Sequence, residues 1–311
     1  MFELLLPFFL FALLFFIFTI VWRIKARKYI SSGTVASAYD AWTQDKLLER
    51  LWGEHIHLGF YSSGKKNIDF RNAKVQFVHE LVKWSGLDKL PKGSRILDVG
   101  CGIGGSSRIL AKYYGFNVTG ITISPAQVKR ARELTPIELN CSFQVMDALD
   151  LKFENGSFDA IWSVEAGAHM NDKIKFADEM LRTLRPGGYL ALADWNSRDL
   201  IAKPPNLLEK LVLKQLLEQW VHPNFISINE FGNILSTNKN SAGKVISENW
   251  NFYTNPSWYD SIIEGIRRPF AILSLGPFAI IKSIREIPTI ILMNWAFKRG
   301  LMEFGVYKCR G

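Results

Sequence analysis

Cysteine is scarce in this sequence, which carries only Cys101, Cys141 and Cys309 among its 311 residues. They lie far apart and form no Cys-x-x-Cys pair, so we expect neither a disulfide scaffold nor a zinc ribbon, and a reducing compartment is indicated. Internal repeats and low-complexity linkers are also lacking. With 48% hydrophobic and 22% charged residues, a disordered or collagen-like chain is excluded. The length predicts one large domain or one domain with an appendage.

Acidic residues are outnumbered, 29 against 38 basic ones, which gives a formal net charge of +9. A basic excess of this kind is typical of proteins that bind nucleic acid or a membrane surface. No signature of an RNA-binding module is visible, so no nucleic-acid partner is predicted. The positions of the basic residues favour the membrane instead.

A long hydrophobic run occurs at the amino terminus. From Leu4 to Trp22 there is no charged residue, and nineteen helical residues rise about 28 Å, close to the thickness of a hydrocarbon core. Four basic residues follow by position 28. A secretory signal peptide, the alternative, would carry its positive charge before the apolar core. We therefore predict an uncleaved single-pass anchor with its basic flank at residues 1–28, and the rest of the chain on the cytoplasmic side.

A second basic and apolar region covers residues 263–310. No apolar run there reaches eighteen residues, so a second span is not predicted. Two interpretations stay open for this region. It forms ordinary buried helices with solvated lysines and arginines, or it forms a lipid-facing surface or an apolar lid over a lipidic substrate.

Strands and helices alternate through the middle of the chain. Strands are expected at 95–99, 117–123, 142–146, 158–164 and 189–194, and helices at 104–114, 125–134 and 173–184. Such alternation predicts a parallel, doubly wound α/β sheet. Outside it we expect helices at 68–85, 205–220 and within 257–298, and strands at 246–253 and 303–309. The predicted organisation is a helical cap at 29–92, a ligand-binding core at 93–200, and a substrate-side lid with the last strands at 201–311.

A glycine-rich loop, Gly100-Cys101-Gly102-Ile103-Gly104-Gly105, joins the first strand to the following helix. Glycines there let the backbone approach a ligand at the start of a helix. The spacing also satisfies the G-x-G-x-x-G dinucleotide motif, so a nicotinamide dehydrogenase has to be considered. That motif requires an acidic residue about twenty positions later, and none occurs between Gly115 and Arg132.

Acidic residues at two strand ends indicate a different ligand. Asp98, two residues before the loop, is placed to hold the amino acid part of S-adenosylmethionine, and Asp147 to accept from the adenine amino group. Thr122 and Gln127 occupy the region that would meet the ribose hydroxyls. Either aspartate alone could be a solvated carboxylate. Together with the glycines and Pro186-Gly187-Gly188 they predict an S-adenosylmethionine-dependent methyltransferase.

Three segments resemble the quinol and tocopherol C-methyltransferases of photosynthetic organisms: DVGCGIGGSSRILAKYYGFNVTGITISPAQVKRA, WSVEAGAHM and LRPGGYLALADWN. AYDAWTQD, WGEHIHLG and REIPTIILM also fit, so the resemblance covers nearly the whole chain. It implies a Rossmann-like class I methyltransferase sheet with helical additions, with donor motifs at 95–104, 154–162 and 181–190. Thr122 stands where methyltransferases usually carry a ribose-binding acid. The implied donor-binding residues are His57, Asp98, Gly100, Gly102, Gly104, Thr122, Gln127, Asp147 and Ala148.

The resemblance implies methyl transfer to a ring carbon of a prenylated benzoquinol, in plastoquinone and tocopherol biosynthesis at a plasma or thylakoid membrane. The expected partners are this hydroquinone and membrane lipid, and protein partners are left open. A γ-tocopherol C-methyltransferase is the alternative within the class, and a non-catalytic donor-binding membrane protein is the alternative outside it.

Glu165 and His169, after the fourth strand, are the predicted catalytic residues, because a hydroquinone becomes nucleophilic when a base takes its phenolic proton. His169 has an ordinary alternative as a hydrogen-bonded loop residue. His55 and His57 could share a face only in an extended segment, and in this family type that segment folds over the donor. No metal is predicted, since no carboxylate or cysteine cluster joins these histidines.

Overall fold

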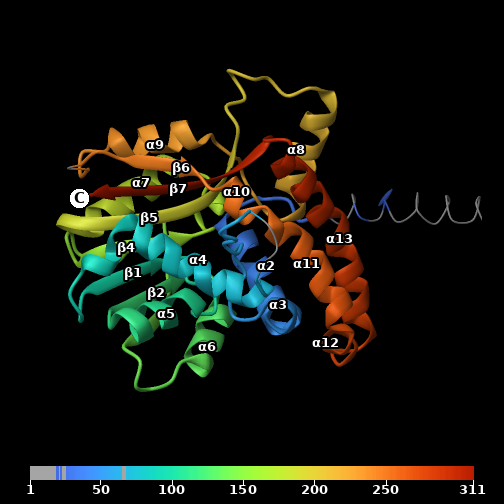
Figure 1. Ribbon diagram of the computed structural model, residues 1–311, viewed down its shortest axis with the longest axis horizontal. Coiled ribbons are helices and arrows are strands. Elements are labelled where there is room, and N and C mark those ends of the chain that lie inside the picture. The colour runs from blue at the N-terminus through green and yellow to red at the C-terminus, as the bar shows by residue number, and fades with distance from the viewer. Residues whose placement is uncertain (1–18, 21, 23–25, 65–67, 242) are drawn as a thin grey trace, which may run out of the picture.

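The computed structural model describes residues 19, 20, 22, 26–64, 68–241 and 243–311 (Figure 1). The anchor predicted at residues 4–22 therefore lies almost wholly outside the described residues. Within the described ranges, no helix is both long enough and apolar enough to cross a membrane.

A seven-stranded sheet organises the fold, in the order β3-β2-β1-β4-β5-β7-β6 (Figure 1). The strands are β1 (Arg95–Val99), β2 (Asn117–Thr122), β3 (Cys141–Val145), β4 (Phe158–Val164), β5 (Leu184–Ser197), β6 (Ile246–Asn249) and β7 (Met302–Arg310). The first five are parallel, and β7 runs antiparallel between β5 and β6. Since β1 lies between β2 and β4, the strand order reverses there, which is the point where open α/β sheets bind ligands. The predicted doubly wound, Rossmann-like sheet is confirmed.

Helices cover both faces of this sheet. They are α2 (Ser32–Gln44), α3 (Leu47–Trp52), α4 (Phe70–Ser85), α5 (Gly105–Tyr114), α6 (Pro125–Leu134), α7 (Lys173–Thr183), α8 (Leu207–Gln219), α9 (Ile228–Ser236), α10 (Asn251–Thr254), α11 (Pro256–Arg267), α12 (Pro269–Leu273) and α13 (Pro277–Lys298). Two short 3-10 turns, η1 (Leu87–Lys89) and η2 (Gly167–His169), complete the set. The sequence patterns did not predict helix α9.

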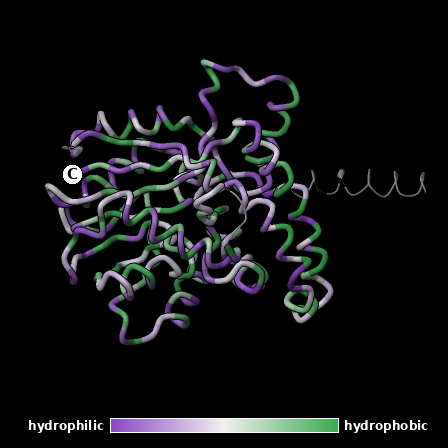
Figure 2. The backbone as a smooth tube through the Cα atoms, viewed as in Figure 1, coloured by the Kyte–Doolittle hydropathy of each residue, from purple (hydrophilic) through white to green (hydrophobic). Residues whose placement is uncertain are grey.

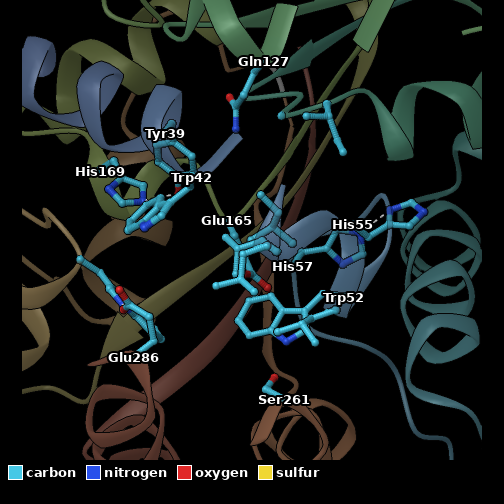
Figure 3. A pocket seen from close by; sticks show the side chains of 18 of the residues that line it. Tyr39, Trp42, Trp52, His55, His57, Gln127, Glu165, His169, Ser261 and Glu286 are labelled. Carbon is cyan, nitrogen blue, oxygen red and sulfur yellow. Dashed lines mark hydrogen bonds between the residues drawn. The ribbon is translucent and has the colours of Figure 1, made fainter. Parts of the chain in front are cut away.

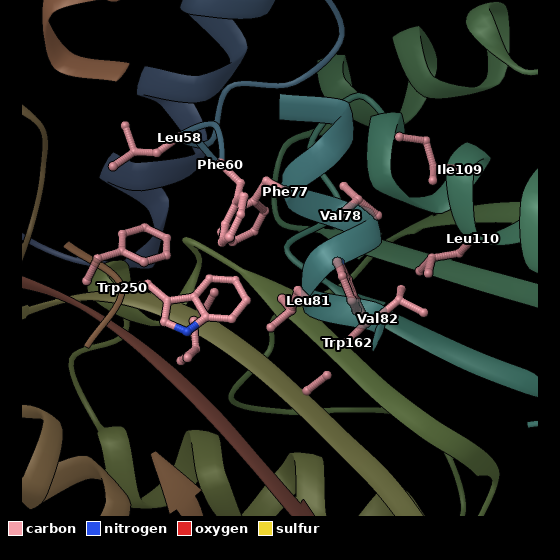
Figure 4. Close-up of a cluster of buried hydrophobic side chains, with 14 of the residues drawn as sticks. Leu58, Phe60, Phe77, Val78, Leu81, Val82, Ile109, Leu110, Trp162 and Trp250 are labelled. Atoms are coloured by element: carbon pink, nitrogen blue, oxygen red, sulfur yellow. The ribbon is translucent and has the colours of Figure 1, made fainter. Parts of the chain in front are cut away.

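The buried side chains of β1 and β4 alternate between the two faces, as a strand's pleat requires. Ile96 and Trp162 enter one cluster, together with residues of α4 and α5 such as Phe77 (Figure 4). Leu97 and Ile161 enter the other cluster, with residues of α7 and α9. The segment predicted as a helical cap, 29–92, therefore contains helices in two places. Helix α4 packs into the core, whereas α2 and α3 lie across the carboxyl edge of the sheet.

Two predicted strands differ from the structure by more than two residues at one end or both. The strand expected at 246–253 ends at Asn249, whose side-chain oxygen accepts from the amide of Asn251, 3.0 Å away, and starts the short helix α10. The alternation of aromatic residues there reflects burial of Trp250 in the core rather than a longer strand. Pro186-Gly187-Gly188 lies inside β5, where the register against β4 shifts, so the strand expected to begin at 189 is longer and contains a bulge.

The segment α2–α3 is held across the carboxyl edge of the sheet by polar contacts. Asp40 of α2 accepts from the hydroxyl of Ser124 at 2.5 Å and from the amide of Ala126 at 3.0 Å, at the start of α6. Glu49 of α3 pairs with Arg130 of α6 at 2.6 Å. This segment therefore closes over the strand ends where a ligand would bind.

Candidate active site

A cavity of about 670 Å³ lies at the carboxyl ends of the central strands. Its walls come from the glycine-rich loop, the loop after β4, α2–α3 and the helices α11 to α13. Figure 3 shows Gln127 at one end, and Ser261 of α11 and Glu286 of α13 at the opposite end. Glu165 lies between them. The volume is within the range of pockets that hold small ligands.

The glycine-rich loop leaves room for a ligand at Gly102. Gly102 has φ +55°, and a Cβ there would meet nothing closer than Gln127 Nε2 at 3.9 Å, so it would project into open cavity. Gly100 and Gly104 serve packing instead. A Cβ on Gly100 would lie 2.3 Å from that of Ala166, and one on Gly104 would lie 2.7 Å from Phe143. The glycines of one motif thus have separate functions.

The start of α5 and Asp98 form a polar end of the cavity. No side chain caps α5, whose first residues Gly105 and Ser106 line the cavity, so free backbone N–H groups and the helix dipole favour a carboxylate there. Asp98 accepts from the Ser107 hydroxyl at 2.5 Å, and burial raises the pKa of its carboxyl to about 7. A carboxylate beside an uncapped helix start suits the ammonium and carboxylate of an amino acid.

Thr122 and Gln127 act as one unit. The Thr122 hydroxyl donates to the Gln127 carbonyl oxygen at 2.6 Å, which leaves the Gln127 amide NH₂ near the glycine loop. Ala148 also lines the cavity, as do Gly100 and Asp98. Asp147 and Gly104 are not among the cavity's lining residues. Asp147 instead accepts from the backbone amide of Leu149 at 2.9 Å, just beside Ala148.

His57 does line the cavity, in a loop that is not extended. Its Nε2 lies 3.0 Å from Nδ1 of His55, and its own Nδ1 lies 2.8 Å from the Leu58 carbonyl. Because a carbonyl can only accept, Nδ1 of His57 carries the proton. Burial lowers the pKa of His57 to about 3, so its imidazole is neutral.

Glu165 occupies a strained position directly after β4. It has φ +55°, which is uncommon for a residue other than glycine, and this conformation directs its side chain toward the cavity (Figure 3). Its Oε1 accepts from the Leu58 amide at 2.7 Å. Burial, with the charge of Asp194 nearby, raises the pKa of the Glu165 carboxyl to about 8. Glu165 is thus a carboxyl that can gain or lose a proton near neutral pH.

His169, the second predicted catalytic residue, is already hydrogen-bonded. Its Nδ1 lies 3.3 Å from the carbonyl of Val221, and its Nε2 lies 2.8 Å from the hydroxyl of Tyr39 in α2 (Figure 3). The carbonyl places the proton on Nδ1, so Nε2 accepts from Tyr39. Burial lowers the pKa of His169 to about 4. This histidine is neutral, with both ring nitrogens engaged.

Aromatic residues that the sequence analysis did not select also line the cavity: Tyr39, Trp195, Trp220, His222 and Trp258. The ring of Trp195 lies 5.8 Å from that of Trp220 and 5.4 Å from that of Trp258. These residues come from α2, β5, α11 and the segment after α8, far apart in the chain. No local motif connects them, so only the fold reveals the aromatic wall.

The donor-binding residues fit S-adenosylmethionine at one end of the cavity. The open space at Gly102, the uncapped start of α5, Asp98, and the amide of Gln127 offer partners of suitable charge and polarity for an amino acid joined to a nucleoside. Glu165 and the aromatic wall remain for a second substrate.

Comparison with known proteins identifies the family of this chain. Residues 97–192 match a family model described as a methyltransferase domain. The chain is 54% identical to the 2-methyl-6-phytyl-1,4-hydroquinone methyltransferase of Synechocystis sp., over 93% of this chain and 91% of that protein. It is 34% identical to the chloroplastic tocopherol O-methyltransferase of Arabidopsis thaliana, over 85% of this chain and 78% of that protein.

Among solved structures, a mycolic acid cyclopropane synthase complexed with SAH and CTAB superposes with a TM-score of 0.76 at 15% identity, covering 91% of this chain and 99% of that one. At this identity the likeness concerns the fold alone.

Proposed function

Because this chain belongs to the family of the hydroquinone and tocopherol methyltransferases and is S-adenosylmethionine-dependent, we propose that it methylates a ring carbon of a prenylated benzoquinol, 2-methyl-6-phytyl- or 2-methyl-6-solanesyl-1,4-benzoquinol. The observation that carries the proposal is the 54% identity to the Synechocystis hydroquinone enzyme along 93% of the chain. A tocopherol-type chromanol is the second candidate, favoured by the 34% identity to the Arabidopsis enzyme.

An apolar opening of the cavity supports a substrate with a lipid tail. Ile280, Ile284, Ile287 and Ile290 of α13 all line the cavity, and their spacing of three or four residues places them on one side of the helix. Ile290 is buried, but the other three are 36% to 47% exposed. Side chains that line a cavity and are also exposed form its mouth. A long prenyl tail would leave the cavity here.

Helices α11, α12 and α13 carry further exposed apolar residues besides those at the mouth. They are Ile266, Phe270, Leu273, Ile281 and Ile291. Figure 2 shows hydrophobic stretches along this helical group, which projects away from the sheet. An exposed apolar surface of this kind is typical of sites that meet a partner or a membrane. We propose that it faces the bilayer in which the quinol dissolves.

The last residue of the predicted anchor and the basic flank that follows it contact helices α8 and α13 near this mouth. Trp22 is buried, and its carbonyl accepts from Gln219 of α8 at 3.2 Å. Arg27 pairs with Glu286 of α13 at 2.8 Å. An anchor ending at Trp22 would therefore hold the mouth of the cavity against the membrane. We propose a single-pass protein with its catalytic part on the cytoplasmic side of a plasma or thylakoid membrane.

When bound, S-adenosylmethionine supplies an electrophilic methyl group on a sulfonium sulfur. The chain must then position a quinol ring, exclude water and accept a proton. The aromatic wall of Trp195, Trp220 and Trp258 offers flat surfaces against which a ring packs. Glu165, when ionised, is the base that takes a proton from one ring hydroxyl, which raises the electron density of the ring carbon.

The proposal is tested with detergent-solubilised full-length protein, isotope-labelled donor, and a panel of phytyl and solanesyl quinols and chromanols. We expect label on a ring carbon of the benzoquinols, located by NMR of the product, and a higher kcat/KM for them than for the chromanols. Preference for the chromanols would favour the second candidate. Donor binding without methylation of any compound would indicate a non-catalytic protein and overturn the proposal.

A further inference from the structure

His222 is a buried histidine that lines the cavity and has an unused nitrogen. It is 3% exposed, and its Nε2 has no hydrogen-bond partner among the residues that the structure describes. Its Nδ1 lies 3.3 Å from the carbonyl of Ala168. Because that carbonyl can only accept, Nδ1 carries the proton and Nε2 presents a lone pair. A buried acceptor without a partner costs stability, so its retention needs an explanation.

Within the described part of the chain, none of the neighbouring groups forms a hydrogen bond with this nitrogen. The parallel ring of His169, with its centroid 4.3 Å away, uses its own Nε2 to accept from Tyr39. Oε1 of Glu165 is engaged by the Leu58 amide. Among the described cavity-lining residues, the buried indole N–H groups of Trp52, Trp195 and Trp258 are donors without partners, but none of them lies within hydrogen-bond distance of His222 Nε2.

The backbone is strained so that His222 takes this position. Val221 has φ +61°, a conformation that a β-branched residue rarely adopts. The same residue supplies the carbonyl that orients His169. Two residues other than glycine, Glu165 and Val221, therefore have strained backbones beside the cavity. Glu165 is the proposed base, and Val221 directly precedes His222, whose Nε2 is the acceptor.

His222 also packs beside the aromatic wall of Trp195, Trp220 and Trp258. Its ring lies 5.4 Å from that of Trp195 and 5.0 Å from that of Phe225. A ring that packs against this wall brings its substituents close to Nε2. The unused lone pair requires a donor, and the ring hydroxyl of a quinol is such a donor.

We propose that His222 Nε2 accepts a hydrogen bond from the second ring hydroxyl of the quinol, the one that Glu165 does not deprotonate. This contact would select a substrate with two ring hydroxyls, and the inference rests on the proposed function. In a chromanol the corresponding oxygen is an ether and carries no hydrogen. If a chromanol were bound, the lone pair of His222 Nε2 would face the ether oxygen, and neither atom could donate a hydrogen bond. Sites built to hydrogen-bond a substrate hydroxyl reject analogues that lack it.

The test compares two substitutions that separate the two ring nitrogens. In His222→Asn the side-chain NH₂ can still donate to the Ala168 carbonyl, but no group replaces Nε2. In His222→Gln the longer side chain places a carbonyl oxygen near the position of Nε2. His79→Asn is the matched control, because His79 bonds Tyr114 on the far side of α5 and does not line the cavity.

The substrates are the benzoquinol, the two monophenols that each lack one ring hydroxyl, and the chromanol. Wild type and His79→Asn should prefer the benzoquinol. In His222→Asn we expect kcat/KM for the benzoquinol to fall about tenfold or more, while that for one monophenol and for the chromanol changes little. In His222→Gln part of the preference should return. Calorimetry should give unchanged donor affinity for all variants.

An unchanged ratio of benzoquinol to chromanol in a folded His222→Asn would overturn the inference. So would equal losses on every substrate, since a residue with a purely structural role gives that result. If wild type itself methylates no benzoquinol, the proposed function fails instead, and the two failures are therefore distinguishable.

Discussion

Replacing Glu165 by glutamine removes the proposed base while preserving its surroundings. The glutamine carbonyl can still accept from the Leu58 amide, which lies 2.7 Å from Oε1 in the wild type. Glutamine also has the same backbone preferences as glutamate at φ +55°. A positioned base contributes at least about 100-fold to a rate. We therefore expect turnover of Glu165→Gln to fall by that factor above pH 8, with donor affinity nearly unchanged.

The pKa of about 8 makes this loss depend on pH. At pH 7 only about one tenth of the Glu165 carboxyls are ionised, so wild-type kcat/KM should rise about tenfold per pH unit below pH 8 and then level off. The glutamine variant has no such group, and its profile should lack this rise. The ratio of wild type to variant is thus largest above pH 8 and shrinks as the pH falls toward 6.

Stability gives an independent measurement of the same pKa. In the folded protein Glu165 stays protonated up to about pH 8, whereas in the unfolded chain its carboxyl ionises near the ordinary glutamate pKa of 4.5. The folded state therefore binds more protons, and wild-type stability falls relative to the glutamine variant as pH rises from 4.5 to 8, by up to about 1.4 kcal/mol per unit. Denaturant unfolding of both proteins at several pH values measures this difference.

Steady-state assays with labelled donor provide the kinetic profiles, and Glu230→Gln, an exposed site on α9, is the matched control. A near-wild-type rate for Glu165→Gln above pH 8 would refute the role of Glu165 as the base. A wild-type profile without a rise below pH 8 would refute the argument from burial. Loss of donor binding in the variant would instead place Glu165 in the donor site.

Three further outcomes are expected. Asp98→Asn should weaken donor binding about ten- to a hundredfold in calorimetry, and wild-type affinity should decline below pH 7, where the carboxyl protonates. Gly102→Ala and Gly187→Ala both place a Cβ at positive φ in open space and should destabilise the fold similarly, by about 1–2 kcal/mol, but only the former should weaken donor binding. Deleting residues 1–18 should abolish pelleting with membranes at alkaline pH, whereas deleting 1–28 should also lower Tm, since it removes the buried tryptophan and the ion-paired arginine before α2.

Local patterns in the sequence were sufficient for the core of the fold. β1, α6 and β4 have the predicted bounds, because strand and helix periodicities and the Ser124 cap act over a few neighbouring residues. The pattern failed where tertiary packing overrode it. Residues 250–253 look like strand because aromatic residues recur there, yet only Trp250 among these aromatics is buried, and the residues belong to the turn and short helix after Asn249.

The donor end of the site was also accessible from the sequence. Asp98, Gly100, Gly102, Thr122, Gln127 and Ala148 all border the cavity. They lie at the ends of successive parallel strands, and such ends meet at one edge of a sheet whatever the rest of the chain does. Gly104 and Asp147 share the same motifs but face other contacts, since a motif fixes the backbone path and not the direction of every side chain.

The substrate end was decided by tertiary structure. Tyr39 occupies Nε2 of His169, so that nitrogen is not free to meet a substrate, while the free nitrogen belongs to His222. Glu165 was predicted, but its raised pKa depends on burial and on the charge of Asp194, which is distant in sequence. Hydrogen-bond satisfaction and desolvation are properties of what surrounds a group in space. Sequence patterns, which report spacing along the chain, therefore predicted residues that border the cavity but could not choose between these histidines.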